Sequence, residues 1–116
     1  TALDLKEAIR RATPPHKRNK TLARVFQAIR IAVNSELEKL KIFLNIFFDY
    51  LTVGGRIIIM SYHSIEDRMV KHAFRSLKES GKLNILTKKP VTPSEDELTS
   101  NNRSRSAKLR AAERLI

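Results

Sequence analysis

GGRIIIMSYHSIEDR, residues Gly54 to Arg68, contains the clearest structural signals of this chain. The two glycines indicate a tight turn, because glycine adopts backbone conformations that other residues avoid. Apolar residues follow from Ile57 to Met60 without polar alternation, which predicts a strand covered on both faces, as inside a parallel sheet. Polar residues begin at Ser61, so we expect the strand to span residues 57–61 and to end in a short polar elbow.

An amphipathic helix is predicted to follow the elbow. Ser64 and Asp67 have the spacing of a capping box, so we expect the helix to begin at Ser64 and to end at Ser80-Gly81. Its apolar positions recur about every four residues and predict one buried face, made of Ile65, Met69, Val70, Ala73, Phe74 and Leu77. In open α/β sheets, ligands bind at the carboxyl ends of strands beside helix N-termini, which is the place of residues 61–67.

Residues 54–71, GGRIIIMSYHSIEDRMVK, resemble the C-terminal signature of the RsmH (MraW) family, bacterial S-adenosylmethionine-dependent methyltransferases that act on 16S ribosomal RNA. Two further blocks resemble the same family in the same order. They are residues 24–37, RVFQAIRIAVNSEL, and residues 89–114, which contain NNRSRSAKLR. The resemblance covers nearly everything from about residue 16 onward. Tyr62 departs from it, since we expect phenylalanine there, and the match begins well inside the family's length.

The resemblance implies an α/β fold, namely the C-terminal part of a Rossmann-like class I methyltransferase. A long helix would be followed by a strand, a helix, a second strand and a terminal antiparallel strand. Residues 1–20 would be the end of a helical insertion domain with its connector, and residues 21–116 the C-terminal half of the methyltransferase domain. The implied reaction is methyl transfer from S-adenosylmethionine to the exocyclic amine (N4) of a cytidine in 16S rRNA of the small ribosomal subunit, in the cytoplasm.

The composition agrees with a small, basic, intracellular domain. The 116 residues contain no cysteine, and the formal net charge is +11. Residues 1–34 carry 8 basic and 2 acidic side chains, and residues 101–116 carry 5 and 1. Two separate basic regions favour a phosphate-rich partner such as nucleic acid. No apolar run approaches the roughly 18 residues of a membrane span, and no aromatic-rich amphipathic helix favours a membrane surface.

Before the central stretch, the sequence predicts two helices. Residues 1–12 have a helical apolar pattern that Pro14-Pro15 ends, and residues 16–20 are a polar, basic connector. From Leu22 to Leu51, apolar residues recur at helical spacing, which predicts one long helix. Ser35 with Glu38 could cap a second helix, so a kink near Asn34 is an alternative.

After the central stretch, apolar and polar residues alternate weakly over residues 83–87, which predicts a strand. Ser94 with Glu97 predicts a short capped helix through Leu98. Residues 107–114 are ambiguous. Their composition favours a helix, whereas apolar and charged residues alternate over 107–111 as in a half-buried strand. The resemblance favours a final antiparallel strand, which we predict, with residues 57–61 beside either 107–114 or 83–87.

The chain lacks a glycine-rich cofactor loop. Nucleotide-type cofactors in such folds need a glycine turn after the first strand, and the only glycines here are Gly54, Gly55 and Gly81. By resemblance, S-adenosylmethionine would be bound mainly by a preceding part of the protein, and no cofactor-binding residue is assigned here. We therefore expect the chain to be an inactive C-terminal fragment. An exposed sheet edge would favour its dimerisation.

His63 and Ser61 are the candidate substrate-pocket residues. An imidazole at a strand end could form a hydrogen bond with the target base or a phosphate. Equally, it could bond to a backbone carbonyl and pack within the turn. Ser61 could form a hydrogen bond near the base, whereas Ser64 is better explained as a helix cap. Tyr62 could stack on a base, but alternation along a buried strand favours core packing. No metal site is expected, because the three histidines lack ligand spacing.

Arginines in the family-like blocks are the candidate RNA contacts, since guanidinium groups suit phosphate recognition. They are Arg24, Arg30, Arg103, Arg105 and Arg110. The alternative role for each is an ion pair within the fold. Two other classes of function stay open. One is a non-catalytic basic RNA-binding module, and the other is a helical scaffold that uses residues 22–51 as an interface.

Overall fold

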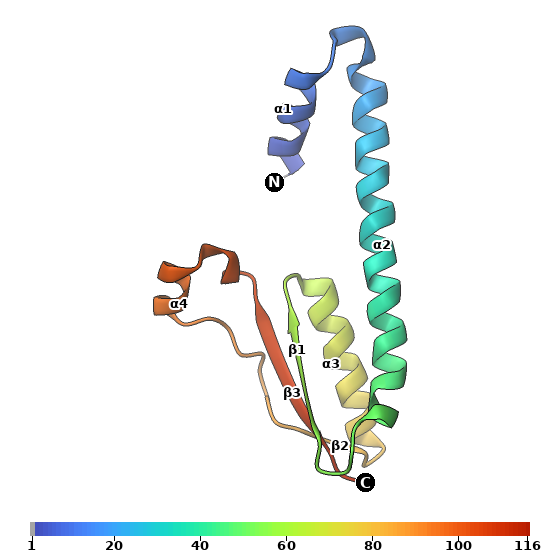
Figure 1. The fold of residues 1–116 in the computed structure, drawn as a ribbon, viewed down its shortest axis with the longest axis vertical. Coiled ribbons are helices and arrows are strands. Elements are labelled where there is room, and N and C mark those ends of the chain that lie inside the picture. Colours follow the sequence, from blue (N-terminus) through green and yellow to red (C-terminus); the bar gives the residue numbers. More distant parts are fainter. Residues whose placement is uncertain (1) are drawn as a thin grey trace. The chain divides into compact units, whose positions relative to one another are not determined.

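The computed structural model describes residues 2–116 as a mixture of helices and strands (Figure 1). In chain order the elements are α1 (Ala2–Ala12), a 3-10 turn (Pro15–Lys17), α2 (Arg18–Tyr50), β1 (Arg56–Ser61), α3 (Ser64–Glu79), β2 (Leu83–Ile85), α4 (Glu95–Ser100), a second 3-10 turn (Asn102–Ser104) and β3 (Lys108–Arg114). They divide into two compact units, Thr1–Glu38 and Lys39–Ile116, and the division falls within α2.

The first unit contains α1 and the beginning of α2. Helix α1 confirms the predicted helix, and Ile9 is its buried residue. The predicted connector over residues 16–20 is wrong in its second half, because α2 already begins at Arg18. Pro15 fits the first turn of a helical segment, where its fixed φ angle is suitable and no N–H is needed. Arg18 also donates from Nε to the Thr13 carbonyl at 3.1 Å, which holds the turn.

Helix α2 confirms the prediction of one long helix, since its 33 residues run without the alternative break near Asn34. Its end lies in the second unit and is capped by a distant arginine. Arg114 donates from Nη1 to the carbonyls of Phe48 at 2.9 Å and Leu51 at 2.6 Å, and its guanidinium lies 4.2 Å from the Phe48 ring centroid. The last carbonyls of a helix have no partner within it, so this side chain supplies one.

The sheet has the order β1-β3-β2, and both neighbouring pairs are antiparallel. Ile57 pairs with Ala112, and Leu83 pairs with Arg114. The predicted terminal strand is therefore confirmed, and the helix favoured by composition is wrong. As a strand, this segment buries Ala112 completely and pairs its backbone on both sides.

Strand β2 is shorter than the predicted residues 83–87. Leu86 still donates its N–H to the Ala111 carbonyl at 2.9 Å. The reciprocal bond goes to a side chain, because the Ala111 N–H donates to the Thr87 Oγ1 at 3.1 Å. A threonine hydroxyl thus replaces a carbonyl, and regular pairing ends.

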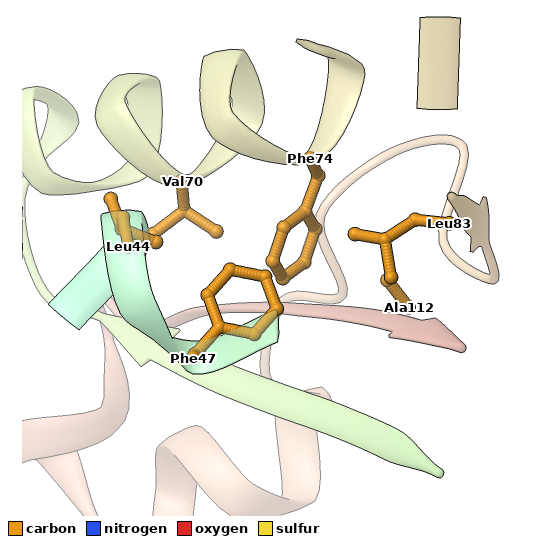
Figure 2. Close-up of a cluster of buried hydrophobic side chains, with 6 residues drawn as sticks. All are labelled: Leu44, Phe47, Val70, Phe74, Leu83 and Ala112. Atoms are coloured by element: carbon orange, nitrogen blue, oxygen red, sulfur yellow. The ribbon is translucent and has the colours of Figure 1, made fainter. Parts of the chain in front are cut away.

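One cluster of buried side chains joins the end of α2, α3 and one face of the sheet (Figure 2). Its members are Leu44, Phe47, Val70, Phe74, Leu83 and Ala112. The rings of Phe47 and Phe74 meet edge to face, with centroids 5.8 Å apart and planes at 62°, an arrangement that aromatic pairs favour. The predicted apolar face of α3 is confirmed at Val70 and Phe74, whereas Ile65 is 50% exposed.

Strand β1 corrects the prediction that residues 57–60 are covered on both faces. Its burial alternates, so Ile57 and Ile59 pack on the cluster while Ile58 is 65% and Met60 50% exposed. β1 also pairs only with the antiparallel β3 and lies at the edge of the described sheet. Unbroken apolar residues occur in strands covered on both faces, but within the described chain the helices cover one face.

Candidate functional site

The elbow after β1 begins with two side chains on opposite faces of the strand. Ser61 is only 3% exposed and shares the helix-covered face with Ile57 and Ile59, since alternate strand residues point the same way. Tyr62 is 54% exposed, so the prediction that it packs in the core is wrong. Its hydroxyl lies 3.2 Å from the Met60 Sδ, which holds the ring beside the open face of the sheet.

His63, not Ser64, is the N-cap of α3, which corrects the predicted capping box by one residue. Its Nδ1 accepts the Glu66 N–H at 3.3 Å, and its Nε2 lies 3.2 Å from the Glu66 Oε1. The same Glu66 oxygen accepts the Tyr62 N–H at 3.2 Å. The elbow is thus a reciprocal cap in which an imidazole replaces the usual hydroxyl or carboxylate. This arrangement requires an unprotonated Nδ1 and places a proton on Nε2.

Asp67 and Arg110 form a buried ion pair beneath the elbow. Arg110 Nε lies 2.7 Å from Asp67 Oδ1 and its Nη2 3.1 Å from Oδ2, and each side chain is about 10% exposed. The Arg110 hydrogen bonds lower the pKa of Asp67 below its usual 3.8, although burial opposes the shift; the charges of Arg110, Lys108 and Lys71 lower it further. Two parallel bonds of this kind fix both position and orientation.

Sequence reasoning did not find this pair. The sequence pattern assigned Asp67 to the capping box at the start of the helix, and Arg110 was a candidate RNA contact. The two lie 43 residues apart, on α3 and β3, so no local pattern connects them. Alternation along β3 would have placed Arg110 on the same face as Ala112, and a buried arginine requires an acidic partner. The structure supports the alternative role of Arg110, an ion pair within the fold.

The other candidate arginines are exposed. Arg24 and Arg30 lie on α2 in the first unit, whereas Arg103 and Arg105 lie in and just after the 3-10 turn of the second unit. Ser61 and His63 lie at one elbow, but among residues 2–116 no hydrogen bond joins them, and they differ in exposure.

A cavity of about 370 Å³ opens on the face of the sheet that the helices leave uncovered. Its apolar lining includes Met60 and Leu109, which are paired across β1 and β3, and Val91. Tyr62 also lines the cavity, and the connection between β2 and β3 contributes polar residues that include Glu97, Asn101, Arg103 and Ser104.

Two further kinds of site are absent from residues 2–116. No group of three or more histidine, aspartate or glutamate side chains is placed to hold a metal ion. In the same part of the chain, no helix has both the length and the apolar character needed to cross a membrane.

The mixed fold, with a small antiparallel sheet and a polar elbow, is consistent with an α/β methyltransferase domain. The sequence model of the MraW methylase family matches residues 1–115, so the chain belongs to this family.

Similar curated proteins include the "Ribosomal RNA small subunit methyltransferase H" of Kosmotoga olearia, 53% identical, and that of Thermotoga neapolitana, 57% identical. The protein of the same name from Synechococcus elongatus is 50% identical. These alignments cover 99%, 97% and 98% of this chain but only 40%, 38% and 38% of the three relatives. The chain therefore spans about two fifths of the length of the relatives that it matches.

Proposed function

We propose that this chain is the C-terminal part of a longer enzyme that transfers a methyl group from S-adenosylmethionine to the exocyclic amine N4 of a cytidine in 16S rRNA. The observation that carries the proposal is the family match over residues 1–115, together with relatives named as small-subunit rRNA methyltransferases. The methyl donor and the cytosine N4 acceptor come from the family resemblance.

The fold proposed for the whole domain is Rossmann-like. An antiparallel final strand between two others supports it, because methyltransferases of this fold end in such a strand. The free edge of β1 is where we place the next strand of the parallel part of the sheet. Within this chain we assign residues 1–20 to the end of a helical insertion domain and residues 21–116 to the methyltransferase domain.

We propose that the described residues do not by themselves form a site for S-adenosylmethionine. Gly54 and Gly55 precede β1, at the opposite end from Ser61, and the Gly54 N–H donates to the Arg114 carbonyl at 2.8 Å. Gly81 follows α3. No glycine of the described chain lies at the carboxyl end of a strand, where close backbone approach to a cofactor is needed. We therefore place the cofactor mainly on other parts of the protein.

The 116-residue chain alone should neither bind S-adenosylmethionine with micromolar affinity nor methylate RNA. Calorimetry with the purified chain tests the first point and transfer of labelled methyl groups to small ribosomal subunits tests the second. Micromolar binding would show that the cofactor site lies within residues 1–116.

The function itself is tested with the full-length protein, labelled S-adenosylmethionine and small ribosomal subunits that lack the modification. We expect the label on N4 of one cytidine of 16S rRNA. Label on another base, or on protein only, would overturn the proposal.

The amine lone pair of cytidine is delocalised into the ring, so the reaction depends on positioning and on a hydrogen-bond acceptor for the amine. We propose that the elbow supplies one wall of the base pocket. His63 presents its half-exposed imidazole there, while the buried Ser61 holds the strand end beneath it.

Two variants separate the proposed substrate role of His63 from its role as a helix cap. His63→Ala removes both, whereas His63→Asn keeps a good cap acceptor and removes the imidazole. If the imidazole contacts substrate, both variants of the full-length enzyme lose roughly ten- to a hundredfold in turnover, a barrier of about 1.4–2.7 kcal/mol, with unchanged cofactor affinity. Full activity in His63→Asn would assign His63 to capping alone.

RNA contacts are proposed for the exposed arginines, namely Arg24 and Arg30 in the first unit and Arg103 and Arg105 in the second. Arg110 is left out because its guanidinium is committed to Asp67. Each phosphate neutralised should add about −0.7 to −0.9 to the logarithmic salt dependence of RNA affinity. Changing one of these arginines to Gln should therefore flatten that slope by about one unit, measured by filter binding.

The exposed edge of β1 also supports a proposal for the isolated chain. Unpaired strand edges recruit other strands, so two copies would pair there when the rest of the sheet is missing. Sedimentation of the 116-residue chain should show a dimer, and the full-length protein should not dimerise through this edge.

A further inference from the structure

The connection between β2 and β3, residues 86–107, is much longer than its topology requires. The two strands are neighbours and antiparallel, and such a pair is usually joined by about two to five residues. Instead the chain leaves the sheet, forms α4 and the 3-10 turn Asn102–Ser104, and returns. Long connections in small domains usually carry function.

Hydrogen bonds hold this connection in one arrangement. Val91 and Leu109 exchange backbone bonds of 2.8 and 2.9 Å, which attach its first part to β3. Ser94 Oγ accepts the Glu97 N–H at 3.2 Å at the start of α4. At the end of α4, Asn101 Oδ1 accepts the Arg103 N–H at 3.1 Å. These bonds hold the backbone that carries part of the cavity lining.

The cavity beside this connection is compatible in size and lining with one nucleotide. Its volume of about 370 Å³ lies at the lower end of the range for small-molecule sites. Met60 and Leu109 supply an apolar surface, and the exposed ring of Tyr62 stands at the wall. Such a ring can stack on an unpaired base of RNA.

Two charged residues of the lining suit the exocyclic amine and the phosphate of a nucleotide. Glu97 supplies a carboxylate, an acceptor for the exocyclic amine of cytosine or of another amino-bearing base. Arg103 supplies a guanidinium, which pairs with a phosphate. A carboxylate and a guanidinium on one partly apolar cavity match a ligand that carries both an amino group and a phosphate.

We propose that this cavity binds one unpaired, amino-bearing nucleotide of the RNA, next to the nucleotide that is methylated. The inference rests on the proposed function. It assigns a separate subsite, because Met60 and Ser61 point to opposite faces of the sheet, and the cavity lies on the Met60 side. Tyr62, Glu97 and Arg103 would then position the substrate.

The first test changes Tyr62 in the full-length enzyme and measures methylation of small ribosomal subunits. Tyr62→Ala should raise the KM for RNA about tenfold, within the range for loss of one stacked base, and the loss should fall on KM rather than kcat. Tyr62→Phe should keep the wild-type KM. Tyr50→Ala is the matched control, because Tyr50 is 83% exposed and lies outside the cavity.

The second test examines the amino group. Glu97→Ala should weaken RNA binding about tenfold, whereas Glu95→Ala on the same helix, outside the cavity lining, should not. Nucleotides near the methylated cytidine are then replaced one at a time by analogues that lack the exocyclic amine. At one position, the replacement should weaken RNA binding by the wild-type enzyme. At that position it should not weaken RNA binding by Glu97→Ala any further.

An unchanged KM in Tyr62→Ala would overturn the inference, and so would a loss confined to kcat, which would place the methylated base itself in the cavity. Lost affinity for free S-adenosylmethionine in Tyr62→Ala would overturn it in favour of the cofactor. Failure of the proposed function is distinguishable, because the wild-type enzyme would then not methylate rRNA. RNA filter binding by Tyr62→Ala and Glu97→Ala would still test the cavity.

Discussion

The two faces of the sheet are built from the same kinds of residue but have different surroundings. On β1, Ile57 and Ile59 pack against the cluster made by α2 and α3, while their neighbours Ile58 and Met60 are half or more exposed. The covered face therefore contains the hydrophobic core. The open face contains the cavity and the Tyr62 ring. The packing of other elements, and not the residues of the strand, therefore decides which face stabilises the fold.

The largest expected effect is the loss of a buried ring from the covered face. Phe74 is 1% exposed and meets Phe47, so Phe74→Ala should lower the free energy of unfolding by about 3–5 kcal/mol. Ile58→Ala on the open face is the control and should change it by about 0.5 kcal/mol. Urea unfolding of the 116-residue chain measures both, because further elements of the proposed Rossmann-like domain would cover Ile58 in the full-length protein. Equal losses would mean that Ile58 is packed as tightly as Phe74.

An effect of similar size is expected at the Asp67–Arg110 pair. Asp67→Asn should cost about 3–5 kcal/mol, because it leaves a buried guanidinium without its counter-charge. The combined variant Asp67→Leu, Arg110→Met should recover much of that loss, since apolar residues of similar size can replace a buried pair. If the single and the double variant lose the same amount of stability, the loss in Asp67→Asn does not come from an uncompensated Arg110.

Acid should weaken the same pair. The folded-state pKa of Asp67 lies below its usual 3.8, so its contribution to stability is fully present above about pH 4 and is lost as the pH falls through the folded-state value. Unfolding midpoints measured between pH 6 and pH 2 should therefore fall less steeply for the Asp67→Leu, Arg110→Met variant than for the wild type. If the midpoints of both proteins fell equally with pH, the acid sensitivity would not come from Asp67.

A smaller difference is expected between two arginines near the ends of the paired strands. Arg114 caps α2 through two carbonyls and lies over Phe48, so Arg114→Met should cost about 1.5–3 kcal/mol. Arg56 lies 3.8 Å from Glu113, and its side chain is 67% exposed. Arg56→Met should therefore change stability by less than about 1 kcal/mol. A larger effect at Arg56 than at Arg114 would reverse the comparison.

Most helices and the order of elements could be predicted because their signals are local. Helical apolar spacing located α2 and α3, and Ser94 with Glu97 located the start of α4. The start of α3 was found, but its cap was assigned to Ser64 because histidine is not among the usual N-cap residues. Of the candidate site, sequence alone located the elbow at Ser61 and His63.

Local patterns were enough to predict the glycine turn, the strand and helix around residues 54–80 and the absence of a glycine-rich loop, since each depends on residues within a few positions of one another. Long-range packing established which face of β1 is covered and that a cavity opens on the other. It also confirmed the strand over residues 108–114, which the residues alone left ambiguous and the family resemblance predicted. It also joined Asp67 to Arg110 and Arg114 to Phe48, pairs that lie 43 and 66 residues apart. Backbone preferences and periodicity extend over a few turns of chain, whereas burial and ion pairing depend on which distant elements meet.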